Sequence, residues 1–285
     1  MMLYHVSQYN DARFAVPHGN EANSRGYERA SLIDRTHGSV HMGVGICRLA
    51  PHGETASFLH ANEKGIYVIE GEIDLRCGDA ASKLGTEDFA LIPYGTVHAF
   101  RNSTDKPARW LEMQAPQPKL PGGWQDTFFM DAFNWPEVVR APDFASADTR
   151  FVGHFEEKNP IVNKRLGAEG LYVHRFIERN LGSNHFYMMR GVLTPGGICD
   201  YHDHPVEEFY IGLSGTCDME IEGKRFHLTA GSVVWTGVGT SHAFYQTGAE
   251  PFRWLETQAP QFPAQHGLRN YLEWNKLKPE AGGKS

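Results

Sequence analysis

The strongest constraint on this chain is a set of histidines and one glutamate at fixed spacing. The set reads Gly196-x5-His202-x-His204-x3-Glu208-x6-Gly215, followed by Gly239-x2-His242. Three imidazoles and one carboxylate suit a divalent cation of intermediate softness, such as manganese, iron, nickel or zinc. We therefore predict a metal site with the ligands His202, His204, Glu208 and His242.

Strand geometry explains this spacing. On an extended strand, side chains two or four positions apart point to the same face. His202, His204 and Glu208 then project together, whereas Glu207 points to the other face. The alternative is a few surface histidines in a chain that has 15 of them. It does not account for a set bounded by glycines at both ends.

These residues resemble the two conserved motifs of the cupin superfamily, G-x5-H-x-H-x3,4-E-x6-G and G-x5-P-x-G-x2-H-x3-N. The first motif is matched at every defined position. The second departs twice, with Gly237 in place of the proline and Gln246 in place of the asparagine. Neither departure removes a ligand. The resemblance implies a small antiparallel jelly-roll barrel with the metal inside its mouth.

The chain contains this unit twice. Residues 26–117 align without a gap on residues 170–261, and 28 of the 92 positions are identical, where chance would give roughly five or six. We therefore predict an all-β bicupin of two tandem antiparallel jelly-roll (double-stranded β-helix) barrels. The most similar block includes Arg253 and Glu256, matched by Arg109 and Glu112. A feature present in both copies is expected to serve the fold, so this block is left out of the predicted site.

The predicted domains follow from the repeat and from the Pro- and Gly-rich stretch before residue 124. They are an N-terminal barrel (1–123), a connecting segment (124–165), a C-terminal barrel (166–266) and a C-terminal segment (267–285). Short helical segments are expected after each barrel, at 127–140 and at 268–274, where their aromatic residues would cover barrel faces.

The first repeat departs from the metal-binding pattern. Phe58 and Lys64 stand in place of the first histidine and the glutamate. The remaining His60 and His98, beside an ammonium group, would bind a cation poorly. We therefore expect one divalent metal ion per chain, and expect His60 and His98 to be relics satisfied by local hydrogen bonds. An anion pocket formed by His60, Lys64 and His98 is the alternative.

Differences between the two copies indicate further site residues. Tyr210 shares the parity of the ligands and replaces an isoleucine, so we predict that it faces the metal and has a catalytic role beside Glu208. Arg190 could pair with a substrate carboxylate in a bidentate way. Trp235 and Gln246 complete the predicted substrate contacts. Core packing for Trp235 and a solvent-facing side chain for Arg190 are the alternatives.

Composition narrows the class of protein. The net charge of −7 and the absence of a Lys/Arg cluster argue against nucleic acid or an anionic membrane as partner. No leader peptide and no long apolar span are visible. The four cysteines lack CxxC spacing and suggest reduced thiols in a cytoplasmic protein. Sheet edges that need cover lead us to expect a homo-oligomer, a dimer or larger.

The ligand count leads to a function. Four protein ligands leave two adjacent positions on a metal that prefers six, which is the open arrangement of a catalyst. Iron or manganese is favoured, and an oxygenase acting on a small chelating organic acid, aromatic or enol is the first hypothesis. With nickel or zinc, a non-redox isomerase, lyase or aminohydrolase is the alternative. A bicupin that binds a ligand without turning it over is the third.

Overall fold

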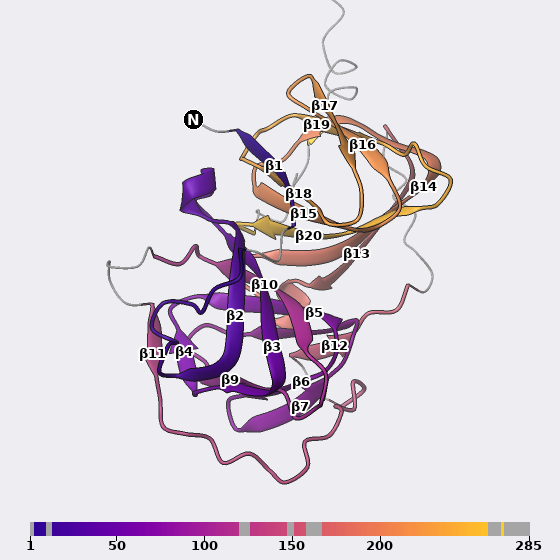
Figure 1. Ribbon diagram of the computed structural model, residues 1–285. Coiled ribbons are helices and arrows are strands. Elements are labelled where there is room, and N and C mark those ends of the chain that lie inside the picture. The colour runs from indigo at the N-terminus through magenta and orange to yellow at the C-terminus, as the bar shows by residue number, and fades with distance from the viewer. Residues whose placement is uncertain are drawn as a thin grey trace, which may run out of the picture. The chain divides into compact units, whose positions relative to one another are not determined.

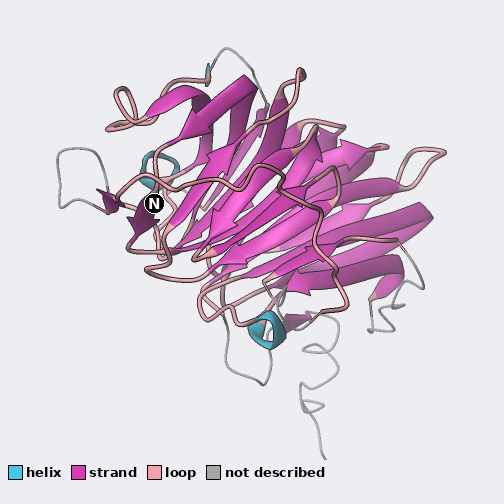
Figure 2. Cartoon of the chain, turned by 90° about the horizontal axis from the view of Figure 1, so that it is seen from below, coloured by secondary structure: helices cyan, strands magenta, loops and turns pink. Residues whose placement is uncertain are grey.

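The chain folds almost entirely into antiparallel β-structure, as predicted (Figures 1 and 2). The structure is a computed structural model that describes residues 3–9, 13–119, 126–146, 151–157, 167–261 and 269–270. Helical structure within these residues is limited to short 3-10 turns such as Arg35–His37 and Arg179–Leu181. None of the described helices is long and apolar enough to span a membrane.

The first barrel comprises residues Asn10–Glu157 and Phe176–Tyr187. Its sheet has the order β11-β4-β9-β3-β10-β5-β8-β12, with β2 paired to β3 and β7 to β6. The strands are β2 (Ser24–Ile33), β3 (Gly43–Thr55), β4 (Phe58–His60), β5 (Glu63–Glu70), β6 (Ile73–Cys77), β7 (Ala80–Leu84), β8 (Asp88–Ile92), β9 (His98–Arg101), β10 (Ala108–Ala115), β11 (Thr127–Phe129) and β12 (Val152–His154). Alternate residues of these strands meet inside, where Trp110, Phe100 and Ile66 are fully buried.

The second barrel comprises residues Met1–Tyr9, Lys158–Arg175 and Met188–Ser285. Its sheet has the order β1-β18-β15-β20-β14-β19-β16-β17, with β13 and β21 also paired to β14. The strands are β1 (Tyr4–Gln8), β13 (Ala168–Ile177), β14 (Tyr187–Asp203), β15 (Glu207–Ser214), β16 (Cys217–Ile221), β17 (Lys224–Leu228), β18 (Ser232–Thr236), β19 (His242–Tyr245), β20 (Phe252–Ala259) and β21 (Arg269–Asn270). Its core includes Met219, Phe244 and Trp254.

The two repeats exchange their edge strands. Strand β1 precedes the first repeat in sequence but pairs with β18 of the second barrel (Figure 1). Strand β12 precedes the second repeat but pairs with β8 of the first barrel. Strand β1 therefore belongs to the second barrel, whereas the sequence places it in an N-terminal domain of residues 1–123. Each exchanged strand covers an edge that would otherwise expose unpaired backbone groups.

The loop after β13 also belongs to the first barrel. The carboxylate of Glu63, which is buried, accepts hydrogen bonds from the backbone N–H groups of Asn184 and His185 and from the Ser183 hydroxyl. Three donors converging on one buried carboxylate fix this loop, because each donor would otherwise lose a partner out of reach of water.

The predicted helix at 127–140 is wrong. Thr127–Phe129 forms β11, which pairs with β4, and the described residues that follow it, up to 146, contain no helix. A threonine followed by two phenylalanines favours a strand. The aromatic residues do cover a barrel face: the guanidinium groups of Arg76 and Arg101 stack on the rings of Phe133 and Trp135 at 4.2 and 4.6 Å. Of the predicted helix at 268–274, only the strand β21 lies within the described residues.

All four cysteines are free, as predicted, and three of them are buried.

Candidate metal centre

Three histidines converge inside the second barrel. His202 lies at the end of β14, His204 follows that strand by one residue, and His242 begins β19. One potential ligand atom from each lies within 4.8 Å of the others, and all three residues are buried. Across the described ranges, no other group of three or more potential ligands meets this condition.

A β-bulge on β14 turns His202 inward. Cys199 pairs with Phe244 and His202 pairs with His242, so three steps along β14 match two steps along β19. Regular alternation from the inward-facing Cys199 would place His202 on the outer face. The extra residue of the bulge turns the His202 side chain to the inner face instead. The His202 and His242 rings therefore lie side by side, with centroids 4.3 Å apart.

Backbone carbonyls fix the tautomers of two of these rings. Nδ1 of His202 lies 2.6 Å from the carbonyl oxygen of Asp200, and Nδ1 of His242 lies 3.0 Å from that of Thr240. A carbonyl oxygen can only accept, so each Nδ1 carries the hydrogen and each Nε2 keeps its lone pair for a metal. Burial, with the nearby His202 and His204, lowers the pKa of His242 well below its ordinary value, which keeps the ring neutral.

Glu208 supplies the anionic donor. It lies on β15, is buried, and places its Oε1 3.2 Å from Nε2 of His204 and its Oε2 3.3 Å from Nε2 of His242. Two ligands about 2.1 Å from one ion and at right angles to each other lie about 3 Å apart. The three imidazoles therefore fit a divalent cation, and Glu208 lies beside two of them; the group with all ligand atoms within 4.8 Å of one another contains the three histidines without Glu208, so ligation by this carboxylate stays a prediction.

Single-strand parity does not explain this convergence. Strand β14 ends at Asp203 and β15 begins at Glu207, so the chain turns between the histidines and the glutamate. Parity does hold within β15, where Glu208 and Tyr210 share a face and pair with Thr236 and Val234 of β18.

Glu208 is held by Gln258 of the shared block and by Thr236 of β18. The side-chain amide of Gln258 donates to Oε1 of Glu208 and to Oε1 of Glu256, at 2.8 Å each. The indole N–H of Trp254 donates to the other oxygen of Glu256 at 3.0 Å. The Thr236 hydroxyl donates to Oε2 of Glu208 at 3.3 Å. Trp254, Glu256 and Gln258 are common to both copies and were for that reason left out of the predicted site.

Burial determines the charge state of these carboxylates. It raises the pKa of Glu208 to about 8, against hydrogen bonds from its neighbours that lower it. Burial also raises the pKa of Glu256, and the charge of Glu208 adds to that effect. Below about pH 8 the metal-free site therefore holds a proton that a cation would displace.

Tyr210 faces the candidate ligands. Its hydroxyl lies 3.2 Å from Nε2 of His242, and the residue is buried. Burial, with the charges of Glu208 and Glu256, raises the pKa of Tyr210 well above its ordinary value. The hydroxyl is therefore protonated at neutral pH and can donate a hydrogen bond towards the metal position.

Arg190 and Trp235 lie on the other face of the sheet. Trp235 pairs with Phe209 of β15 and His5 of β1, so its side chain points away from the face of Glu208. Arg190 precedes Gly191, whose inward side is packed so closely that an added Cβ would lie 2.0 Å from the Trp254 ring. Strand alternation therefore places both predicted contacts outside the metal site.

Gln246 closes a turn instead of lining the site. Its side-chain amide donates to the carbonyl of Glu250, and its backbone N–H donates to Gly197 at 2.9 Å. Asn102, at the same position of the first repeat, makes the equivalent bonds to Lys106 and Gly53. This shared role accounts for an amide side chain in both copies.

In the first barrel an internal ion pair stands where the second has its anionic donor. Nζ of Lys64 lies 3.2 Å from Oε2 of Glu112, and both residues are buried. Nε of Arg29 lies 3.3 Å from the other oxygen of Glu112. The cation required by the alternative anion pocket is therefore already paired.

Phe58 takes the place of His202 in the first barrel. It pairs with His98 across the strands, and its ring packs edge-on against His60 and His98 with centroids 5.0 and 4.6 Å away. Nδ1 of His98 lies 2.8 Å from the Thr96 carbonyl. Within the described structure, Nδ1 of His60 and Nε2 of His98 are buried with no hydrogen-bond partner. The expectation that local hydrogen bonds satisfy both rings is wrong for these two atoms.

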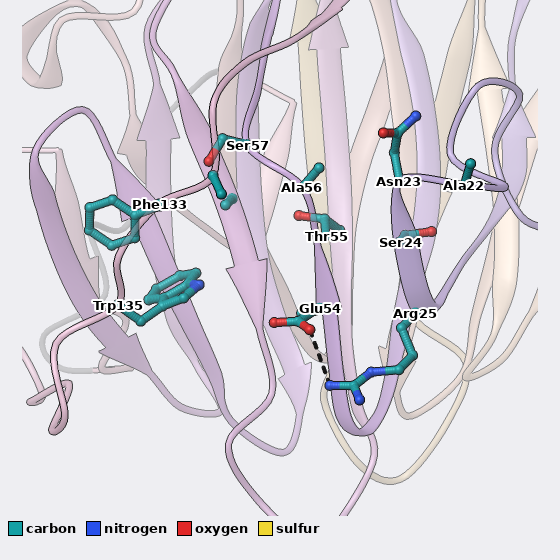
Figure 3. A pocket seen from close by; sticks show the side chains of 12 residues that line it. Ala22, Asn23, Ser24, Arg25, Glu54, Thr55, Ala56, Ser57, Phe133 and Trp135 are labelled. Atoms are coloured by element: carbon teal, nitrogen blue, oxygen red, sulfur yellow. Dashed lines mark hydrogen bonds and ion pairs between the residues drawn. The ribbon is translucent and has the colours of Figure 1, made fainter.

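A separate pocket of about 390 Å³ lies in the first barrel (Figure 3). Residues 22–25 and 54–57 form one wall, and Phe133 and Trp135 form the other. It contains none of the candidate metal ligands. The charged residues that line it, Arg25 and Glu54, form an ion pair of 3.2 Å, so it offers no unpaired charge to a ligand.

Comparisons with known proteins agree with this architecture. A family model described as a cupin domain matches residues 45–113 and 189–257. A structure of oxalate decarboxylase from Bacillus subtilis at pH 4.6 has a TM-score of 0.69 and 17% identity, covering 96% of this chain and 80% of that one. A tryptophan-to-tyrosine variant of the same enzyme gives 0.67 and 18%, covering 96% and 81%. No curated protein matches this chain. These identities show a shared fold.

Metal stoichiometry tests the difference between the barrels. Protein purified without chelators should contain about one divalent ion per chain, measured by plasma mass spectrometry. His202→Ala or Glu208→Ala should bring this close to zero, because each removes a donor. His60→Ala should leave it unchanged. Two tightly bound ions per chain, or loss of metal in the His60 variant, would contradict the assignment.

The pH dependence of metal affinity tests the state of Glu208. Because burial raises the pKa of Glu208 to about 8, binding below that pH must expel its proton, so affinity should rise by up to about tenfold per pH unit until it levels off. Competition with a fluorescent chelator measures this. Glu208→Gln should weaken binding and flatten this slope. An unchanged slope in that variant would show that other groups release the proton.

A reciprocal substitution tests what distinguishes the first barrel. Phe58→His combined with Lys64→Glu supplies the missing imidazole and carboxylate beside His60 and His98. The double variant should hold about two ions per chain, one in each barrel. Phe58→His alone keeps the ammonium group and should hold one. A folded double variant that still holds one ion would show that more than these two positions separates the barrels.

Proposed function

Because the chain belongs to the cupin family, with a cupin domain in each repeat, we propose that its second barrel is a metal-dependent enzyme site for a small organic anion. The observation behind this proposal is the buried group of His202, His204 and His242 with Glu208 at 3.2 to 3.3 Å from two of the rings. Four protein donors leave room on the ion for two oxygens of one substrate.

The charge of the site favours an anionic substrate. Three neutral imidazoles and one carboxylate leave a divalent ion with a net charge near +1. Arg190, the predicted partner of a substrate carboxylate, lies on the opposite face of β14. The metal itself is then the group that binds the anion. Substrates that chelate through two oxygens, such as α-keto acids, enediols or ortho-hydroxylated aromatics, satisfy this arrangement.

The residues around the centre have separable roles. When bound, the metal acts as a Lewis acid that lowers the pKa of a chelating hydroxyl or enol. Glu208, held by Gln258 and Thr236, sets the charge of the site. Tyr210 donates a hydrogen bond or a proton to a substrate oxygen next to His242. The apolar residues Phe244 and Val234, which lie in the same core cluster as Tyr210, keep water away from this hydrogen bond.

Oxygenase chemistry is the first candidate for the reaction. A site with two adjacent open coordination positions, next to apolar side chains, suits iron or manganese and an oxidisable chelating substrate. Lyase chemistry is the second candidate. It is favoured by the similarity to structures of oxalate decarboxylase, and by Tyr210, which can supply the proton that replaces a departing carbon dioxide.

We also propose that the chain acts as a homo-oligomer.

Binding of a small chelating probe tests the proposal. Oxalate or catechol should bind the metal-loaded protein in calorimetry, and should bind neither the metal-stripped protein nor His204→Ala. Over a panel of α-keto acids, catechols and oxalate, oxygen uptake would identify an oxygenase, and anaerobic release of carbon dioxide would identify a lyase. Tyr210→Phe should lower turnover by about 10²-fold or more without changing metal content.

The control is Tyr245→Phe, since Tyr245 lies on β19 one residue beyond the inward-facing Phe244. It should leave turnover and metal content unchanged. Probe binding that is equal with and without metal would overturn the proposal.

A further inference from the structure

One turn of the second barrel holds two of the candidate ligands. It comprises residues 237–240, between β18 and β19. The backbone N–H of Gly239 donates to the carbonyl of His204 at 2.9 Å. The carbonyl of Thr240 lies 3.0 Å from Nδ1 of His242. The position of this turn therefore sets the backbone of one ligand and the ring of another.

The same turn is bound to a residue more than 230 positions away in sequence. The carbonyl of Leu3 accepts hydrogen bonds from the backbone N–H of Gly237 at 2.8 Å and from the hydroxyl of Thr240 at 2.7 Å. Thr240 thus contacts Leu3 with its side chain and His242 with its main chain.

Strand β1 is docked firmly enough to hold that carbonyl. Tyr4 and Val6 pack against the core of the second barrel. The side-chain amide of Gln8 donates to the hydroxyl of Ser232 at 2.6 Å, and the N–H of Tyr9 donates to Gly231 at 2.8 Å. Strand β18 then lies between β1 and β15 (Figure 1), the strand that carries Glu208.

Gly237 provides a donor that the first barrel does not have. Its counterpart in the first repeat is Pro93, which has no N–H. The first barrel keeps the inner bonds of the turn, from Gly95 to His60 and from His98 to Thr96. Its edge strand β12 pairs with Asp88–Ala90 of β8, with further backbone hydrogen bonds from Leu91 to Phe151 and from Phe155 to Glu87, whereas β1 pairs with the whole of β18 and Leu3 reaches the turn beyond it. The glycine that departs from the family motif thus supplies one of the two hydrogen bonds that tie Leu3, immediately before β1, to the turn.

We propose that β1 is a positioning element of the metal centre. Docking of residues 3–8 on β18 holds the 237–240 turn, and through it His204 and His242, in the geometry that binds metal. Metal binding and β1 docking are then linked, so that each favours the other by the same free energy. The proposal concerns metal binding alone and does not depend on the substrate or on the reaction class.

Two pairs of variants test the first half of the linkage. Thr240→Val removes the hydroxyl that reaches Leu3, and Thr240→Ser keeps one. Gly237→Pro removes the N–H, while Gly237→Ala keeps it and places its Cβ 3.3 Å from the Leu3 carbonyl oxygen, which must shift by a few tenths of an ångström. Thr240→Val and Gly237→Pro should each weaken the affinity for Mn²⁺ or Co²⁺ by about 10- to 100-fold, as outer-shell substitutions do. The Ser variant should stay within about threefold of the unsubstituted protein, and the Ala variant should lose less affinity than the Pro variant.

Hydrogen exchange tests the second half. Metal should slow amide exchange in β1, and should leave β12, the corresponding strand of the first barrel, unchanged. Thr96→Val is the matched control, because Thr96 is the counterpart of Thr240 and its hydroxyl has no hydrogen bond to an edge strand in the described structure. Its metal affinity should equal that of the unsubstituted protein. Deletion of residues 3–8 should weaken metal binding at least as much as Thr240→Val.

Distinct outcomes would overturn the proposal. If Thr240→Val and Gly237→Pro bind metal as tightly as the unsubstituted protein, the turn does not depend on β1. If metal leaves β1 exchange unchanged, the two events are not linked. Protein that binds metal normally but turns over no substrate would overturn the proposed function and leave this proposal standing. Unaltered exchange in β15 and β20, central strands of the second barrel, shows that each variant is folded.

Discussion

The structure depends on one constraint, a buried charged side chain at the same position in both barrels. In the first barrel it is Lys64, and in the second it is Glu208. An unpaired charge of this kind costs several kcal/mol, so each barrel must pair it with an opposite charge or neutralise it with a proton. The first barrel supplies the opposite charge internally, with Glu112 at 3.2 Å from Lys64. The second barrel keeps the equivalent Glu256, on which the charge of Arg175 acts, and adds the carboxylate of Glu208, for which a divalent cation would supply a counter-charge.

The shared glutamate and glutamine explain how one framework serves both cases. Gln114 donates to Glu112 at 2.9 Å in the first barrel, as Gln258 donates to Glu256 in the second. In the second barrel Gln258 also bonds to Glu208, which links the framework to the candidate ligands. Without metal, burial raises the pKa of both Glu208 and Glu256 above their unfolded values. Their contribution to stability is then full at acid pH and is lost as pH rises through the raised pKa values. A bound cation removes that loss by stabilising the ionised form.

Much of this could be predicted from the sequence, because the informative signals were local. The motif and the repeat were sufficient for the fold, whereas the argument from parity along one strand was wrong, because the chain turns between Asp203 and Glu207. The face of the sheet that each side chain occupies was harder to predict from the sequence. A β-bulge reverses the parity of β14 just before His202, and a comparison of replaced residues says nothing about which face they occupy. Trp235 was therefore assigned to the wrong face. Its true face follows only from the pairing of β18 with β15, in which Trp235 lies opposite Phe209 and not opposite Glu208 or Tyr210.

Comparison between repeats also misled in the opposite direction. Glu256 was excluded because Glu112 matches it, on the reasoning that shared residues serve the fold. The structure shows that a shared residue can serve the fold in one barrel and orient a ligand in the other, since only the partner at position 64 or 208 has changed sign. The exchange of β1 and β12 was out of reach for another reason. Nothing in a five-residue strand indicates which of two similar edges it will cover.

The edge-strand exchange and the metal centre are connected through the residue at the family's proline position. A proline there, as at Pro93, completes the turn without help and leaves nothing for a neighbouring strand to bind. A glycine, as at Gly237, offers its N–H to Leu3, which fixes the turn from outside the repeat. Three differences therefore coincide in the second barrel: an imidazole at 202, a carboxylate at 208 and an N–H at 237. The first two supply donors to the ion, and the third ties the turn that carries His242 to a strand from the other end of the chain. The centre then takes its donors from the second repeat and the position of the 237–240 turn from Leu3, which precedes the first repeat.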